Sequence, residues 1–181
     1  MRKKIRVAGQ GGQGAITLAY TIGRALALYA NKHVIFTEAY GPEQTGGFAK
    51  ADLIVDDQEI EYPMVDVPDI LVVLSEEGWQ MNGNLLAEGG TVIYENFLVN
   101  PDTTASTYGI PAVKEAENIG RKVVANVILM GAFQELTGII SKENLEKALL
   151  EIIPKGTEEL NLKALHRGYE LGKEIGGKKN E

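Results

Sequence analysis

The sequence predicts an α/β protein: a three-layer α/β/α sandwich built around a mostly parallel, mixed, Rossmann-like sheet. Short β-branched runs alternate along the chain with segments in which apolar residues recur at helical spacing. Residues 69–75 form a continuous apolar run of the kind found in strands buried on both faces. The length of 181 residues, with 44% hydrophobic and 24% charged residues, is typical of a single globular domain spanning residues 1–181.

The N-terminal segment predicts a βαβ unit. A strand is expected over residues 5–8 and a helix over 15–30, where Leu18 and Ile22 share one face. A second strand over residues 33–39 completes a unit of the usual size. The two strands would lie adjacent and parallel, so the loops that follow them would face one crevice.

A hairpin is predicted next. Residues 40–47 form a Pro- and Gly-rich loop, and residues 48–55 have the pattern of a strand. The polar residues 56–58 then indicate a turn into a short antiparallel partner at 59–62. Such a hairpin would make the sheet mixed rather than purely parallel.

The remainder of the chain predicts further strands and then mostly helices. Ser75 is a good N-cap, because Glu76 and Glu77 follow it in the first turn, where the helix dipole favours negative charge. Strands are expected over residues 89–96 and, as a short edge strand, over 107–112. Three helices are expected to close the chain: one over about 123–137 that ends at Gly138, one after Ser141, and one that carries Leu162, Leu165 and Tyr169.

The charge and hydropathy of the chain exclude several classes of partner. A net charge of −7 argues against a broad surface for nucleic acid or anionic membranes, which requires clustered Lys and Arg. The basic N-terminus is interrupted by Gly and Gln before any apolar run, so no signal peptide is expected. No segment has the length of apolar sequence that a membrane span needs, and a cytoplasmic location is predicted.

Cysteine is absent from the sequence. This excludes disulfides, a Cys-ligated zinc site and an iron–sulfur cluster within the chain. With only His33 and His166, no metal site is predicted either. Electron carriers for any redox chemistry would therefore be bound cofactors or would lie on another subunit.

A glycine-rich loop, "GQGGQG" at residues 9–14, joins the first predicted strand to the first helix. Glycines at such a crossing let backbone N–H groups approach a phosphate closely, and the helix N-terminus adds partial positive charge. The spacing satisfies the G-x-G-x-x-G fingerprint of dinucleotide-binding proteins. By itself the motif is also consistent with a close strand–helix crossing that binds nothing.

A second motif, "YGPEQTGG" at residues 40–47, is more specific. Together with the glycine loop it resembles the gamma subunit of 2-oxoacid:ferredoxin oxidoreductases, whose pattern pairs "GxGGQG" with "YGPExRGG". These enzymes use thiamine diphosphate to convert 2-oxoacids and coenzyme A (CoA) to acyl-CoA. The resemblance covers nearly the whole chain, because further blocks follow in the family's order: "YPMVDVPDILVVLS", "GGTVIYEN", "YGIPA", "ANVILMGAF" and "LNLKAL".

The resemblance implies that both motifs face a cofactor, with the glycine loop cradling the CoA pyrophosphate. The residues assigned to cofactor binding on this basis are Gly11, Gly12, Gln13, Gly14, Tyr40, Glu43, Thr45, Gly46 and Gly47. Thr45 departs from the family, which usually has Arg at that place. A neutral hydroxyl there replaces five donors and a permanent charge.

The resemblance also implies partners. Thiamine diphosphate and the iron–sulfur clusters would be held by alpha and beta subunits, with a ferredoxin-like delta subunit in some complexes, and ferredoxin would accept the electrons. This chain would contribute to assembly and to CoA binding, would have little activity alone, and could pair as a homodimer when isolated. Among the family's substrates, 2-oxoglutarate is favoured over pyruvate and branched-chain oxoacids.

Two other functions fit parts of the sequence. The glycine loop, with Glu38 where a ribose-binding acid would lie, would suit an autonomous NAD(P)- or FAD-dependent oxidoreductase. Alternatively, both loops contact protein and the chain is a structural docking module. No catalytic acid, base or nucleophile is assigned, because no Ser-His-Asp, Cys-His or paired-carboxylate arrangement has suitable spacing.

Overall fold

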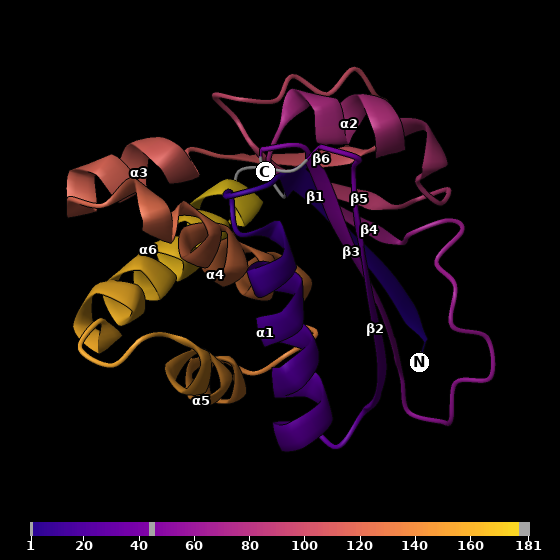
Figure 1. The fold of residues 1–181 in the computed structure, drawn as a ribbon, viewed down its shortest axis with the longest axis horizontal. Helices are drawn as coiled ribbons and strands as arrows, with labels where there is room; N and C mark the ends of the chain where they lie inside the picture. The colour runs from indigo at the N-terminus through magenta and orange to yellow at the C-terminus, as the bar shows by residue number, and fades with distance from the viewer. Residues whose placement is uncertain (1, 44–45, 178–181) are drawn as a thin grey trace.

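The computed structural model describes residues 2–43 and 46–177, which form a sheet flanked by helices (Figure 1). The strands are β1 (Lys3–Gln10), β2 (His33–Tyr40), β3 (Phe48–Asp56), β4 (Ile70–Val73), β5 (Thr91–Glu95) and β6 (Ser106–Ile110). The helices are α1 (Ala15–Tyr29), α2 (Glu76–Asn82), α3 (Ala112–Ile119), α4 (Ala125–Thr137), α5 (Lys142–Ile152) and α6 (Glu158–Gly177), with 3-10 turns η1 (Gly83–Leu85) and η2 (Lys122–Val124).

The sheet has six strands in the order β2-β3-β1-β4-β5-β6. Strand β1 pairs in parallel with β4, and β4, β5 and β6 continue in parallel, whereas β3 runs antiparallel to both β1 and β2. The predicted mixed, mostly parallel sheet is therefore confirmed.

The predicted hairpin partner at residues 59–62 is wrong: that segment contains no strand. Instead β3 pairs with the strand before it, β2, in a register that runs from His33 opposite Asp56 to Tyr40 opposite Ala49. An eight-residue ladder satisfies more backbone groups than a four-residue strand could, which favours pairing across the 41–47 loop.

The prediction that the first two strands lie adjacent is also wrong, because β3 lies between β1 and β2. Its antiparallel direction places the start of β3 beside the end of β1, with Phe48 opposite Gln10. The loop that precedes β3 therefore meets the glycine loop that follows β1, although the two parallel strands do not touch.

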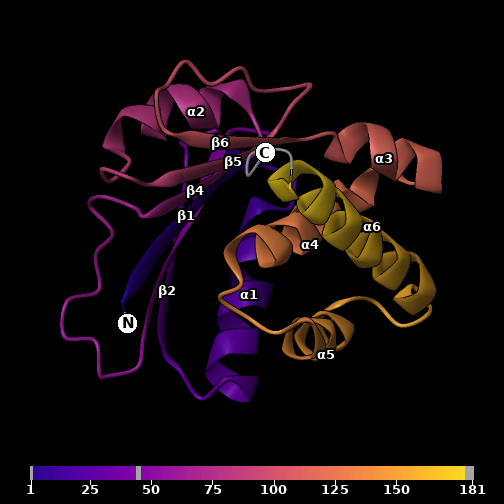
Figure 2. The ribbon, with the colours of Figure 1, turned by 180° about the vertical axis from the view of Figure 1, so that it is seen from behind.

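Helices cover both faces of the sheet unequally. Helices α1, α4, α5 and α6 lie on one side, with α3 packed against α4 and α6, and of the described helices only α2 lies on the other side (Figures 1 and 2). The main core lies on the first side, and a smaller apolar cluster under α2 includes Trp79, Leu71 and Val92. The predicted three layers are present, but the second helical layer is thin.

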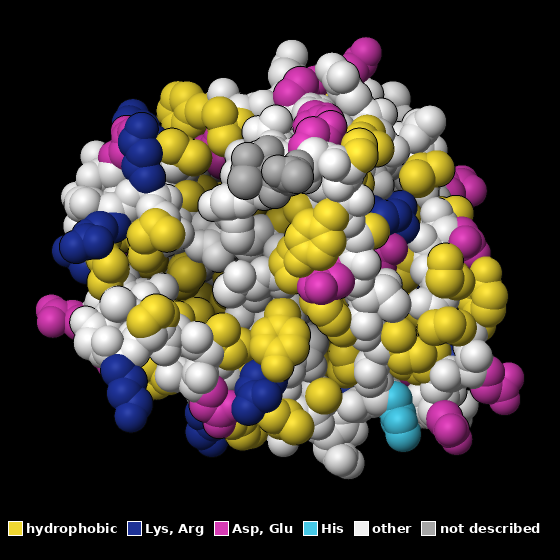
Figure 3. All heavy atoms as spheres, in the orientation of Figure 1, with side chains coloured by type: hydrophobic (Ala, Val, Ile, Leu, Met, Phe, Trp, Pro, Cys, Tyr) yellow, Lys and Arg dark blue, Asp and Glu magenta, His cyan; other side chains and the backbone are white. Residues whose placement is uncertain are grey.

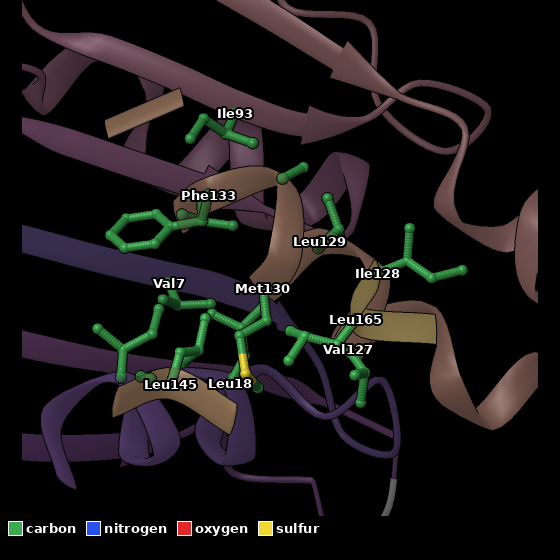
Figure 4. Packing of buried hydrophobic residues seen from close by; sticks show 14 of the residues in the cluster. Val7, Leu18, Ile93, Val127, Ile128, Leu129, Met130, Phe133, Leu145 and Leu165 are labelled. Atoms are coloured by element: carbon green, nitrogen blue, oxygen red, sulfur yellow. The ribbon is translucent and has the colours of Figure 1, made fainter. Parts of the chain in front are cut away.

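Helix α4 is the centre of the main core. Its Phe133 lies between Ile93 and Val7 of the sheet, and its Met130 points toward Leu18 of α1 (Figure 4). Val127 to Gln134 are buried without interruption, so the helix is enclosed on all sides rather than amphipathic. Burying α4 in this way fixes its N-terminus beside the end of β1, where the candidate site lies.

No helix was predicted between the edge strand and residue 123, where the structure has helix α3. The helix begins after Pro111 and ends at Gly120, whose φ of 110° is left-handed. Only Ala112 and Ala116 of this eight-residue helix are buried, so it carries little of the apolar periodicity that predicts a helix. In the part of the chain that the structure describes, no helix is long and apolar enough to cross a membrane.

Candidate functional site

The glycine loop places the open end of α1 at the edge of the sheet. Gly12 has a φ of 90° and Gly14 a φ of 79°, left-handed values that glycine adopts without strain. Gly14 is the N-cap and provides no side chain, and the first intrahelical bond runs from Leu18 N to Gly14 O. The N–H groups at the start of α1 are therefore uncapped by a side chain, and no acidic residue lies in the first turn.

The two sequence motifs contact each other directly. Gly11 N donates to Gly47 O at 2.7 Å, and a methyl group at Gly11 would lie 3.2 Å from Gly46 N. The contact follows from the antiparallel pairing of Gln10 with Phe48. A side chain larger than hydrogen at Gly11 would push the loops apart.

Gln13 braces the glycine loop. Its Nε2 donates to Leu74 O at 3.0 Å, and its Oε1 accepts from Gln10 N at 2.7 Å. Both ends of the amide are thus engaged with the backbone at the ends of two strands. This holds the loop in shape but turns the side chain away from the cleft described next.

A cleft of about 690 Å³ opens beside the glycine loop, and it is visible as a hollow with largely apolar walls in Figure 3. Pockets of this size hold small organic ligands and cofactors. One wall is the glycine loop, the first turn of α1 and Tyr40. The opposite wall comes from residues 121–130 and from the end of α5 to the start of α6: Arg121, Val123, Val124, Asn126, Val127, Met130, Leu149, Ile152, Ile153, Pro154, Thr157, Leu160 and Asn161.

Four of the predicted site residues line this cleft: Gly11, Gly12, Gly14 and Tyr40. Gln13, Glu43, Gly46 and Gly47 do not line it, and the carboxylate of Glu43 fills the space over Gly41 and Gly47. The second loop therefore supports the glycine loop, with its glycines making room for Glu43. Thr45 lies outside the described residues.

Tyr40 stands at the mouth of the cleft with 63% of its surface exposed. Partial desolvation of its hydroxyl, followed by the neighbouring Glu38 carboxylate, raises the pKa of Tyr40 above its usual range. The phenol is therefore neutral at physiological pH. Glu38, considered above as a ribose ligand, does not line the cleft.

The sequence did not single out the residues of the opposite wall. Arg121 is the only charged residue that lines the cleft among the described residues, and it follows the left-handed Gly120. Asn126 lies in the first turn of α4, and its Nδ2 donates to Gly14 O at 3.3 Å. A Gly-Arg pair just before the helical pattern of residues 123–137 was the available signal for Arg121, but nothing local indicated that residues 149–161 would reach the same cleft.

The cleft has the features of an anion-accepting site with an apolar interior. The uncapped N-terminus of α1 and the Arg121 guanidinium are its positive groups. Across the residues described, no group of three or more His, Asp or Glu side chains is placed to hold a metal ion. His166 pairs on the surface with Glu146, at 2.9 Å.

The chain is therefore a Rossmann-like α/β protein whose glycine loop borders an anion-accepting cleft. A family model described as pyruvate ferredoxin/flavodoxin oxidoreductase matches residues 4–171. The 2-oxoglutarate synthase subunit KorC of Methanocaldococcus jannaschii is 44% identical over 180 residues, covering 97% of this chain and 96% of the relative. The pyruvate synthase subunit PorC of the same organism is 30% identical, covering 92% and 94%.

A solved structure has the same fold. The gamma subunit of the keto/oxoacid ferredoxin oxidoreductase from Geobacter sulfurreducens superposes with a TM-score of 0.83 at 34% identity, covering 94% of this chain and 98% of that one. The chain belongs to the pyruvate ferredoxin/flavodoxin oxidoreductase family, as a gamma-type subunit of a 2-oxoacid:ferredoxin oxidoreductase.

Proposed function

We propose that this chain is the gamma subunit of a complex that oxidises 2-oxoglutarate, and that its cleft receives CoA. The choice of 2-oxoglutarate rests on sequence identity to two relatives from one organism. The chain is 44% identical to the 2-oxoglutarate synthase subunit and 30% identical to the pyruvate synthase subunit. The oxoacid itself would be bound by other subunits, together with thiamine diphosphate and the iron–sulfur clusters. A chain without cysteine is consistent with clusters held elsewhere.

Phosphate binding would take place at the start of α1. A side chain at Gly12 would meet no atom within 4 Å, so the backbone there is open to a ligand. The N–H groups of the first turn of α1 and the Arg121 guanidinium supply donors and positive charge for a pyrophosphate. Tyr40, neutral and exposed at the mouth, offers a flat apolar surface for a heterocycle.

The chain's contribution to the reaction would be to hold and orient CoA. Bound CoA supplies the thiol that accepts the acyl group, and its long arm can reach a neighbouring subunit while its phosphates stay on this one. Ferredoxin would then receive the electrons from the partner subunits. Such a complex would reside in the cytoplasm.

Substitution of Gly12 by Asp tests the proposed cradle. The carboxylate would stand where the phosphate is expected and would repel it, so we expect CoA affinity of the co-expressed complex to fall at least tenfold by calorimetry. Gly89→Asp is the matched control, because Gly89 is also left-handed, with a φ of 72° and open space around it, but it does not line the cleft.

Unchanged CoA binding by the Gly12→Asp complex would contradict the cradle. The same titration with NAD⁺ and FAD separates the rivals, because tight binding of either by the lone chain would favour an autonomous oxidoreductase. If the wild-type complex assembles but binds none of the three ligands, the chain is a docking module.

A further inference from the structure

Two asparagine side chains in the cleft wall use only the nitrogen of their amide group in hydrogen bonds within the described part of the protein. Asn126 lies in the first turn of α4 and Asn161 in the first turn of α6. Both line the cleft, and both side chains belong to residues that are only 8% exposed. Amide side chains in such a wall are ordinarily hydrogen-bonded through the nitrogen and the oxygen alike, and neither Oδ1 is among the fully buried atoms, so both oxygens remain accessible.

The nitrogen of each amide is held by the protein. Asn126 Nδ2 donates to Gly14 O at 3.3 Å, and Asn161 Nδ2 donates to Thr157 O at 2.9 Å and to Thr157 Oγ1 at 3.1 Å. Neither Oδ1 accepts a hydrogen bond from any described residue. Because the nitrogens face protein carbonyls, the oxygens are left for a donor that enters the cleft.

The surroundings of these oxygens restrict the donor. The wall on which they sit is otherwise mostly aliphatic, and includes Val127, Met130 and Leu160. An anionic group would be repelled by an amide oxygen and poorly solvated there, whereas a neutral N–H or O–H on an apolar chain would be satisfied. Asn126 borders the positive start of α1 through its bond to Gly14, whereas the Asn161 side chain bonds, among the described residues, only to Thr157.

We propose that Asn126 and Asn161 accept hydrogen bonds from the pantetheine arm of CoA and so select for that arm in the cleft. This inference rests on the proposed function, and it assigns a second recognition point beyond the phosphates. The pantetheine arm is an aliphatic chain with two amide N–H groups and a hydroxyl. It therefore matches acceptors set in an apolar wall.

The test compares two ligands on the co-expressed complex by calorimetry. CoA carries the arm, whereas adenosine 3′,5′-bisphosphate carries the 3′-phosphorylated nucleotide with a single 5′-phosphate and no arm. In Asn161→Leu, and independently in Asn126→Leu, we expect the Kd for CoA to rise about two- to tenfold, the effect of one net hydrogen bond. In Asn161→Leu the Kd for adenosine 3′,5′-bisphosphate should stay within twofold of the wild type, whereas Asn126→Leu, which also loses the bond to Gly14 O, is compared for CoA alone.

Asn144→Leu is the matched control. Asn144 also lies in the first turn of a helix, α5, and its Nδ2 also donates to a backbone carbonyl, Tyr29 O at 3.1 Å, but it does not line the cleft. It should leave both affinities unchanged. Melting temperatures of all variants show which of them fold. If Asn126→Leu does not fold, the test rests on Asn161→Leu.

The other outcomes overturn the inference in distinguishable ways. If both ligands weaken together in Asn161→Leu, Asn161 faces the nucleotide and not the arm. If neither weakens while Gly12→Asp still lowers CoA affinity at least tenfold, the cradle stands and the asparagines have no part in recognition. If the wild-type complex does not bind CoA, the proposed function fails and this inference with it.

Discussion

Arg6 is buried on the face of the sheet that α2 covers, with only 3% of its surface exposed. Its guanidinium forms a two-pronged pair with Asp52 on β3, with N···O distances of 2.7 and 2.8 Å, and also donates to Val65 O and Asn82 Oδ1. One side chain thus joins β1 to β3, to α2 and to the segment before β4. All of these contacts are charge-assisted and shielded from water.

Removing one partner of this pair should destabilise the chain strongly. In Asp52→Ala the Arg6 charge stays buried without its carboxylate, and we expect a loss of about 3–5 kcal/mol in the free energy of unfolding, measured by urea titration. The double variant Arg6→Met with Asp52→Leu removes both charges and should recover most of that loss. A double variant as unstable as Asp52→Ala would show that the cost comes from packing and not from the unpaired charge.

At the scale of elements, helices α4 and α6 cross at small residues. A methyl group at Gly168 would collide with the backbone carbonyl of Ile128 and lie 2.9 Å from Gly131 Cα. Backbone atoms cannot move aside as a flexible side chain can. The absence of side chains at this crossing therefore sets how closely the two helices approach.

Gly168→Ala should lower the free energy of unfolding by about 1–3 kcal/mol, even though alanine favours helix by up to about 1 kcal/mol. Gly176→Ala is the control on the same helix, because a methyl group there would meet only the end of the Leu136 side chain, at 3.2 Å. It should be neutral or stabilising. Equal melting temperatures for the two variants would contradict the role assigned to the crossing.

Elements that depend on local sequence were predicted, and those that depend on distant pairing were not. The glycine loop, the Ser75 cap and the Gly138 end of α4 follow from residue type and spacing, and the structure has all three. The insertion of β3 between β1 and β2 is a choice among strand orders that no local pattern encodes. Helix α3 was missed because only Ala112 and Ala116 face the core.

The residues of the candidate site also fall into two groups: those predicted from local motifs and those that only the packed structure brings to the cleft. Gly11, Gly12, Gly14 and Tyr40 were predicted from motifs and do line the cleft. Its opposite wall, which includes Arg121 and Asn161, comes from residues more than a hundred positions along the chain from the glycine loop, and only the packed structure brings them there.

At the scale of the whole molecule, the chain provides a cleft but no cysteine that could ligate an iron–sulfur cluster. We expect the isolated chain to show no 2-oxoglutarate-dependent reduction of an electron acceptor, because it contains no cysteine for a cluster. Co-expression with its partner subunits should give that activity, with 2-oxoglutarate preferred over pyruvate in kcat/KM. A preference for pyruvate would reverse the proposed substrate while leaving the family unchanged.

Because β3 is inserted between β1 and β2, its register in the sheet also sets the geometry of the cleft. Side chains alternate between faces along a strand, so a slip of one residue would exchange Leu53 and Asp52 and drive a carboxylate into the main core. The same slip would carry Gly47 about 3.3 Å away from Gly11 and open the joint between the two loops. Core packing and the geometry of the ligand site therefore depend on the same strand register. A substitution that shifts the register of β3 would disturb both.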